Sequence, residues 1–174
     1  MGKILKIAAG GAALAALATP VSAQNAASAT ASASTTILQP LTISKTADLN
    51  FGTIVKPTAT GTSTITVSST GSRTITGSNA VAANTAGVSS AAFLVRGEGG
   101  QQFGITVPAS FKMTSGTSTL TVTTSNPAGA TGVLSGSLGS QGTLALGIGG
   151  TLKITKTTVS GAYSGTFKVT VVYD

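Results

Sequence analysis

The sequence contains no cysteine and no histidine, and only three of its 174 residues are acidic. Without cysteine no disulfide can form, so packing and backbone hydrogen bonds must hold any fold that the chain adopts. The common thiolate, imidazole and zinc chemistries also need residues that are missing. The three acids, Asp48, Glu98 and Asp174, lie far apart in the sequence and do not indicate a metal cluster. We therefore expect neither a metal ion nor a cofactor.

The residues that hydrolytic enzymes need are equally scarce. Glycoside hydrolysis uses a facing pair of carboxylates, and here one of only three acids is the last residue. A serine hydrolase that uses lysine as its base needs a serine beside a buried lysine. No Gly-x-Ser-x-Gly stretch occurs, and the nearest resemblance, LSGSLG around Ser137, is typical of a turn. The composition predicts that the protein is not an enzyme.

Aromatic and charged side chains are too few and too scattered to indicate a nucleic-acid partner. The chain has five Phe, two Tyr and no Trp. After residue 23, eight Lys or Arg face three acids, and a basic chain can bind nucleic acid. These basic residues are dispersed, however, and no aromatic residues are interleaved among them for base stacking. We expect no nucleic-acid partner.

Long hydrophobic runs are also missing, since a transmembrane helix needs about 20 consecutive apolar residues. Residues 1–23 instead resemble a secretory signal peptide. Lys3 and Lys6 precede a short apolar run, and residues 19–23 (TPVSA) end in a small-x-small pattern. We expect cleavage before Gln24, export of the chain, and no transmembrane span in the mature protein.

Thr, Ser and Gly are abundant, and apolar residues alternate with them over much of the chain. The clearest stretches are residues 62–69, 103–108, 118–125 and 150–156. A period of two with β-branched residues is typical of half-buried strands. Because Gly and Pro separate these stretches, the pattern predicts an antiparallel sandwich or barrel. A disordered or glycosylated stalk has a similar composition but lacks alternating large apolar residues.

The segment after the expected cleavage site, residues 24–36, has no large apolar residue. Alanine alternates in it with Ser and Thr, at positions Ala27, Ala29, Ala31 and Ala33. As a strand, this segment would present a row of methyl groups on one face. Alternatively, it is a flexible leader of small residues.

Residues 166–173 also alternate, and we expect them to form a strand. The side chains on one face would be Phe167, Val169, Val171 and Tyr173. A long apolar strand at the edge of a sheet invites pairing with another chain, so we infer a partner strand. Gly161 precedes this strand in a turn, where we expect glycine to supply unusual backbone angles.

Gly161 and Tyr173 bracket this strand in a way that resembles the C-terminal motif of chaperone–usher pilus subunits, including their spore-coat-U-like relatives. Residues 47–54 (ADLNFGTI) resemble a segment near the start of pilin domains. The chain lacks the cysteine pair of many pilins. A second resemblance covers most of residues 33–174, through ASTTILQPLTISKTADLNFGTI, FGITVPAS, GGTLKI and SGAYSGTFKVTVVYD. It is to a secreted bacterial family known only as a domain of unknown function.

The pilus resemblance implies an immunoglobulin-like antiparallel β-sandwich over residues 37–174 with an incomplete final strand. In such subunits the N-terminal extension of the next copy fills the open groove. The extension here would be residues 24–36, with Ala27, Ala29, Ala31 and Ala33 as the donor-strand face. The acceptor groove and C-terminal motif would comprise Gly161, Phe167, Val169, Val171 and Tyr173.

The function that this resemblance implies is that of a structural subunit of a bacterial surface fibre. Its partners would be neighbouring copies of itself in a head-to-tail filament, a periplasmic chaperone and an outer-membrane usher. The protein would pass through the periplasm to the cell surface or an extracellular fibre. The alternative is a self-contained cell-surface β-sandwich that recognises a sugar or a protein.

Overall fold

A computed structural model describes residues 26–174 of the chain. The expected signal peptide, residues 1–23, lies outside the described residues. Contacts divide the chain into two units, Met1–Thr35 and Thr36–Asp174. In the first unit, residues 26–35 are exposed and belong to no strand. Among residues 26–174, no helix has the length and apolar character needed to cross a membrane.

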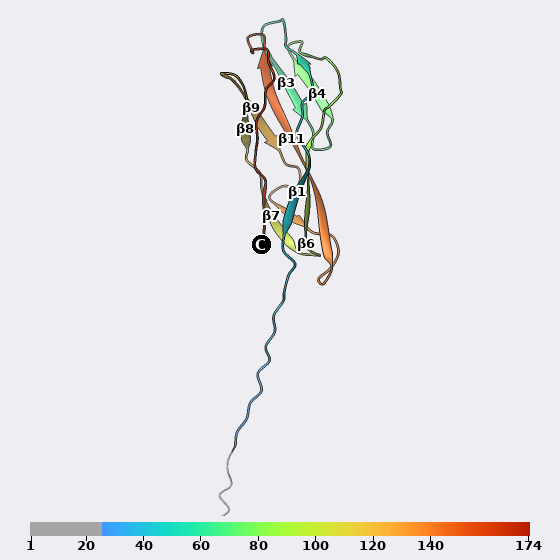
Figure 1. The fold of residues 1–174 in the computed structure, drawn as a ribbon, viewed down its shortest axis with the longest axis vertical. Coiled ribbons are helices and arrows are strands. Elements are labelled where there is room, and N and C mark those ends of the chain that lie inside the picture. Colours follow the sequence, from blue (N-terminus) through green and yellow to red (C-terminus); the bar gives the residue numbers. More distant parts are fainter. Residues whose placement is uncertain (1–25) are drawn as a thin grey trace, which may run out of the picture. The chain divides into compact units, whose positions relative to one another are not determined.

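The described part of the second unit is all-β and contains no helix (Figure 1). Its strands are β1 (Thr42–Ala47), β2 (Ile54–Val55), β3 (Thr62–Val67), β4 (Arg73–Gly77), β5 (Val81–Ala82), β6 (Ala91–Glu98), β7 (Gln102–Thr106), β8 (Ser110–Ser115), β9 (Ser118–Ser125), β10 (Thr131–Val133), β11 (Gln141–Thr155) and β12 (Thr170–Tyr173). The strands expected at residues 62–69, 103–108, 118–125 and 150–156 are confirmed, the last as the end of β11.

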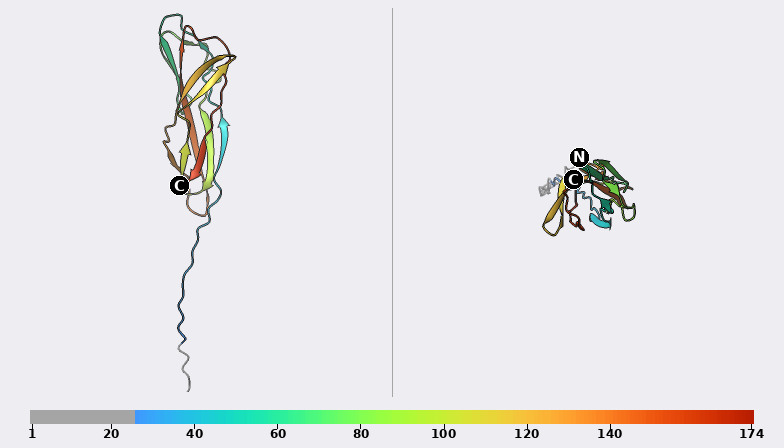
Figure 2. Two further views of the ribbon diagram at one scale, coloured as in Figure 1. Left: turned by 90° about the vertical axis from the view of Figure 1, so that its left-hand side faces the viewer. Right: turned by 90° about the horizontal axis from the view of Figure 1, so that it is seen from above.

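The strands form antiparallel sheets, as the alternating pattern predicts. The largest has seven strands, in the order β1-β6-β11-β3-β4, with β9 also paired to β11 and β8 paired to β9. A three-stranded sheet has the order β10-β7-β12, and β2 pairs with β5. The first part of β11 pairs with β6, and its second part pairs with β3 and β9. β11 therefore connects the two halves of the large sheet (Figures 1 and 2).

Two hydrophobic clusters form the core of this unit. One surrounds Phe103, Leu134 and Ile148, and the other surrounds Ile65 and Val122. In β3 the burial alternates along the strand, because Ser63, Ile65 and Val67 face inward while the threonines between them are half-buried. Strand alternation thus places the β-branched side chains in the core.

The final strand is shorter than the sequence predicts. β12 begins at Thr170 and pairs with β7, whereas residues 165–169 belong to no strand. Just before them, Ser164 forms an isolated bridge with Thr114 in β8. β8 belongs to the seven-stranded sheet and β7 to the three-stranded sheet. Residues 165–169 therefore cross from one sheet to the other, which explains why the strand predicted over residues 166–173 is wrong in its first half.

Candidate functional site

A cleft of about 710 Å³ opens in the second unit between two segments of chain. One rim lies within residues 45–56, which include the end of β1, and the other is residues 158–167, which follow β11. The floor consists of apolar side chains from β6, β8, β9 and β11, namely Ala91, Phe93, Phe111, Met113, Leu120, Leu152 and Ile154.

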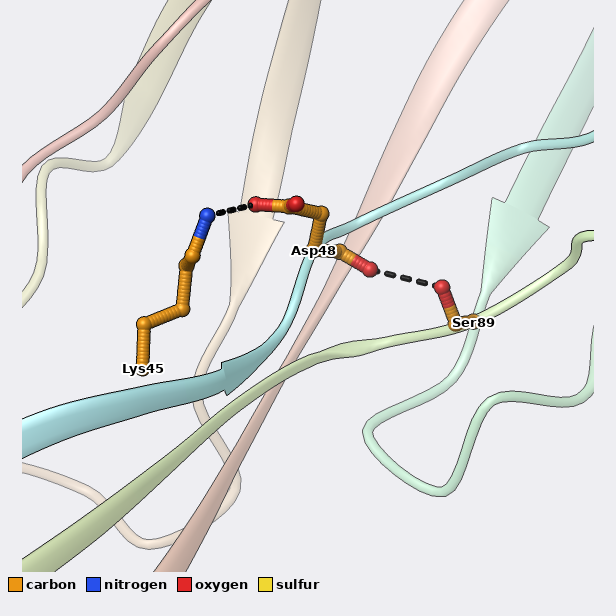
Figure 3. A network of polar contacts seen from close by, with 3 residues as sticks. All are labelled: Lys45, Asp48 and Ser89. Carbon is orange, nitrogen blue, oxygen red and sulfur yellow. Dashed lines mark hydrogen bonds and ion pairs between the residues drawn. The ribbon is translucent and has the colours of Figure 1, made fainter.

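The first rim is attached to the chain that leads into β6. Asn50 and Ser89 exchange backbone hydrogen bonds of 2.8 and 3.1 Å, and the Ser89 hydroxyl donates to the Asp48 carbonyl at 2.6 Å. Lys45 forms an ion pair of 2.6 Å with the Asp48 carboxylate (Figure 3). Both side chains of the pair are well exposed, so it contributes only about 0–1 kcal/mol. The backbone contacts, rather than the ion pair, position this rim.

Arg73 in β4 fixes the middle of the same rim. Its guanidinium donates to the Phe51 carbonyl at 2.7 Å and also to the Asn84 carbonyl. Phe51 itself is buried in the second hydrophobic cluster. The rim is therefore held by its backbone and by one anchored side chain, which leaves its other edge facing the cleft.

The second rim has fewer attachments. The Tyr163 hydroxyl donates to the Val159 carbonyl at 2.8 Å, within the rim itself. Ser164 and Thr114 are paired through backbone hydrogen bonds of 2.8 and 3.0 Å. Among the described residues, one hydrogen bond joins the two rims, from Lys56 Nζ to the Thr158 carbonyl at 3.3 Å. The cleft is thus bridged at one end and separates the rims elsewhere.

The floor exposes side chains that otherwise belong to the core. Phe167 stacks on Phe111 with ring centroids 4.8 Å apart and meets Phe93 edge-on at 6.5 Å. Phe93 packs against one hydrophobic cluster, and Met113 and Leu120 pack against the other, but all three are only partly buried. Both clusters are therefore open to solvent at the bottom of the cleft.

The structure separates the predicted acceptor residues into two groups. Gly161 and Phe167 line the cleft. Val169, Val171 and Tyr173 pack against the first hydrophobic cluster and are not part of the cleft lining. The predicted donor residues Ala27, Ala29, Ala31 and Ala33 are exposed and belong to the first unit.

The reason expected for the glycine at position 161 is wrong. Its φ angle does not lie in the left-handed region that favours glycine. A β-carbon at this position would instead overlap the Ser115 hydroxyl. The second rim approaches β8 closely here, and a larger residue would require the Ser115 side chain to move.

Tyr173 lies outside the cleft and takes part in a separate group of hydrogen bonds. Its hydroxyl accepts a hydrogen bond from the Glu98 backbone N–H at 2.6 Å and donates to the Gln39 carbonyl at 2.9 Å. The carboxylate of Glu98, which is 2% exposed, accepts from the Gln39 N–H at 3.1 Å and from the Gly139 N–H. A β-carbon at Gly97 would overlap the Tyr173 hydroxyl. These contacts hold the start of the second unit against the end of β12.

Sequence reasoning missed most of the cleft. Its first rim was marked only by the resemblance of residues 47–54 to pilin domains, and nothing in the sequence connected it with residues 158–167. The floor residues have no local signal, because they come from four strands that only the fold brings together. Hydrophobic alternation identified several of them as core residues and could not show that the core is open.

The chemistry of the cleft suits an extended apolar segment. Its charged residues are Lys45, Asp48 and Lys56, and the rest of its lining is apolar or hydroxyl-bearing, with glycines and one asparagine. In residues 26–174 no group of three or more His, Cys, Asp or Glu is placed to hold a metal ion. A strand inserted into the cleft would contact the apolar side chains of the floor and would lie between the two rims.

Comparisons with known proteins give one match. A family described as "Domain of unknown function (DUF4402)" matches residues 41–173, which include both rims and the whole floor of the cleft. No curated protein matches the chain, and no solved structure matches it.

Proposed function

The chain belongs to the DUF4402 family, and we propose that it is a structural subunit of a bacterial surface fibre. In this fibre the N-terminal segment of one copy, residues 24–36, fills the cleft of the next copy. The observation that carries the proposal is the cleft itself. The two rims are not joined by a β-ladder of backbone hydrogen bonds. Between them lies a floor on which side chains packed against both hydrophobic clusters are exposed to solvent.

We interpret the fold as an immunoglobulin-like sandwich that lacks one strand. Supporting this interpretation, β1 lies at one edge of the large sheet and β12 at one edge of the small sheet. The start of the unit and the end of β12 meet through the contact of Tyr173 with Gln39, whereas residues 45–56 and 158–167 border the cleft. A strand between these segments would complete the barrier between core and solvent, as an added strand does in pilus subunits.

The energetics favour a strand over a compact ligand. Residues 165–169 belong to no strand, so their backbone groups are available to pair with an inserted segment. Each such hydrogen bond contributes about 0.5–1.5 kcal/mol net. Covering the apolar floor adds about 25 cal/mol for each Å² of apolar surface removed from water. Both contributions grow with the length of the inserted segment.

The contact is head-to-tail, because the donor segment and the acceptor cleft are different parts of the chain. Such a contact does not close on itself and therefore yields a filament. Before assembly the open floor needs protection, and we assign this role to a periplasmic chaperone, followed by an outer-membrane usher. Export through the signal peptide and a final location at the cell surface are parts of the same proposal.

The cleft volume also supports a second candidate, a self-contained binding module. A cleft of about 710 Å³ has the size of sites that hold small molecules. Tyr163 on the second rim is half-buried and could stack against a ring of a sugar. In this alternative residues 24–36 are a leader without a structural role.

Three forms of the chain separate the two candidates. The first is residues 24–174, the second is residues 36–174, and the third is residues 36–174 with residues 24–38 joined after Asp174 by a flexible linker. We expect fibres of the first form in electron micrographs. The second form should aggregate, or should have a lower melting temperature than the third. The third form should be a stable monomer, because its own appended segment fills the cleft.

A matched control carries the same appended segment with Ala27, Ala29, Ala31 and Ala33 changed to Asp, and it should lose the gain in melting temperature. If residues 36–174 alone form a monomer as heat-stable as the third form, the cleft needs no strand. That result would reject the fibre proposal in favour of the binding module.

A further inference from the structure

Two large apolar side chains, Ile37 and Leu38, are exposed at the start of the second unit. Their exposed fractions are 85% and 37%. Alternate side chains of an extended strand share a face. Ile37 therefore belongs to the face that carries Ala27, Ala29, Ala31 and Ala33, and Leu38 belongs to the opposite face. On the alanine face, Ile37 is the one large apolar residue between positions 26 and 38.

The alanine row alone would cover the floor of the cleft poorly. Its four methyl groups are short, and the floor includes the large side chains of Phe93, Phe111 and Leu120. Floor side chains that face a gap lose packing contacts outright. A larger apolar side chain on the alanine face would fill more of this space, and Ile37 is the residue that can supply it.

The attachment of Gln39 determines which end of the segment lies near residues 158–163 of the next copy. Because the Tyr173 hydroxyl holds the Gln39 carbonyl, the chain before Gln39 leaves the second unit near the end of β12. The cleft lies along the other end of the C-terminal stretch, at residues 158–167. In a head-to-tail filament of identically oriented copies, the Gln39 end of one copy faces the 158–163 end of the next.

This arrangement makes the inserted segment antiparallel to the second rim. Ile37 then lies near residues 158–163, and Ala27 lies toward Phe167. The ten steps from residue 27 to residue 37 span about 33 Å when extended, at about 3.3 Å per residue. The nine steps from Thr158 to Phe167 reach about 30 Å at the same rise, so the two stretches are similar in length.

We propose that Ile37 of one copy is the anchor that enters the cleft of the next copy, against Phe111, Met113 and Leu120. The alanine row then follows the cleft along its second rim, residues 158–167. This inference rests on the proposed function, and it adds the residue that specifies the partner and the direction in which the partner's segment lies.

Disulfide trapping tests the inference cleanly, because the chain has no cysteine of its own. Mature chains carrying Ile37→Cys are mixed with mature chains carrying Met113→Cys under mild oxidation, and covalent dimers are measured on non-reducing gels. We expect efficient dimer formation. Leu38→Cys is the matched control, since its side chain lies on the opposite face. Ala27→Cys tests the reversed direction, and Leu120→Cys replaces Met113→Cys if that variant does not fold.

The outcomes distinguish the anchor from the fibre proposal. Dimers from Ala27→Cys but not from Ile37→Cys would overturn the anchor and leave strand donation standing. If none of the three donor positions cross-links to the floor, both proposals fail. As a second measurement, Ile37→Ser should reduce fibre yield about tenfold or more, since a buried Ile side chain contributes more than one tenfold step in affinity. Ile37→Val and Leu38→Ser should assemble normally, and normal assembly of Ile37→Ser would reject the anchor.

Discussion

At the scale of single residues, Tyr173 joins the two ends of the second unit. Its hydroxyl is both acceptor and donor, toward Glu98 and Gln39. A partly buried hydroxyl that makes two hydrogen bonds positions its neighbours as well as stabilising them, because each neighbour would otherwise hold an unpaired polar group. Tyr173 thereby fixes the point from which the N-terminal segment departs, and in this account that point sets the spacing between copies in the fibre.

Replacing Tyr173 with Phe should destabilise the second unit by about 1–3 kcal/mol, because two hydrogen bonds are lost and the partners remain. The measurement is urea unfolding of the mature chain. Tyr163→Phe is the matched control, since the Tyr163 hydroxyl makes one exposed hydrogen bond, to Val159, and its loss should cost less. A Tyr173→Phe variant as stable as the unsubstituted chain would show that the Tyr173 contacts contribute nothing to the fold.

The sequence marks Tyr173 and Gly161 as important but does not give the reasons that the structure shows. The partners of the Tyr173 hydroxyl lie 75 and 134 residues away, so no local pattern could predict them. The glycine at position 161 was expected for its backbone angles and is explained by its contact with Ser115. The sequence pattern singled out positions 161 and 173, whereas the roles of these residues depend on contacts with residues far away in the sequence.

At the scale of elements, β11 shows where alternation fails as a signal. Of this strand the alternation predicted only residues 150–156, and glycines at positions 142, 147 and 149 interrupt the pattern before them. In the structure β11 spans fifteen residues. A β-carbon at Gly150 would lie 2.9 Å from Val122 Cγ1, and one at Gly149 would overlap the Val67 carbonyl. These glycines allow close approach between neighbouring strands, which sequence alone does not distinguish from a turn.

The proposed assembly depends on the N-terminal segment. A large side chain introduced on its alanine face should weaken assembly more than one introduced on its Ser and Thr face. Ala31→Phe should overpack the cleft beside residues 158–167, at a cost of about 1–3 kcal/mol in the contact between copies. Ser32→Phe adds similar bulk on the opposite face and should cost less. A one-residue slip cannot relieve the clash, since it would turn the Ser and Thr face inward.

The measurement is fibre yield by electron microscopy and sedimentation. Circular dichroism of each variant confirms that the second unit still folds. Equal and unimpaired yield from Ala31→Phe and Ser32→Phe would reject the donor role of this segment. That result would not affect the contacts of Tyr173.

At the scale of the whole molecule, composition and alternation were enough to predict an all-β chain with antiparallel sheets. They could not predict the cleft, because it arises where residues 165–169 cross between two sheets. The pairings at the two ends of this crossing, Ser164 with Thr114 and β12 with β7, join residues far apart in the sequence. The sequence resemblance pointed to an open groove along the last strand. In the structure, the open part lies before that strand and is bordered by residues 45–56 on its other side.

Hydrogen exchange of the backbone amides in residues 165–169 tests the central claim, that a strand from a second copy occupies the cleft. Residues 24–174 under assembling conditions are compared by mass spectrometry with residues 36–174, at a temperature where circular dichroism shows both to be folded and with the amides of β3 as an internal reference. We predict exchange slower by about tenfold or more in the longer chain, because an inserted strand pairs with these amides and protects them. Equal exchange in both chains, with fibres present in the first, would contradict the account, since the copies would then be joined by some other surface.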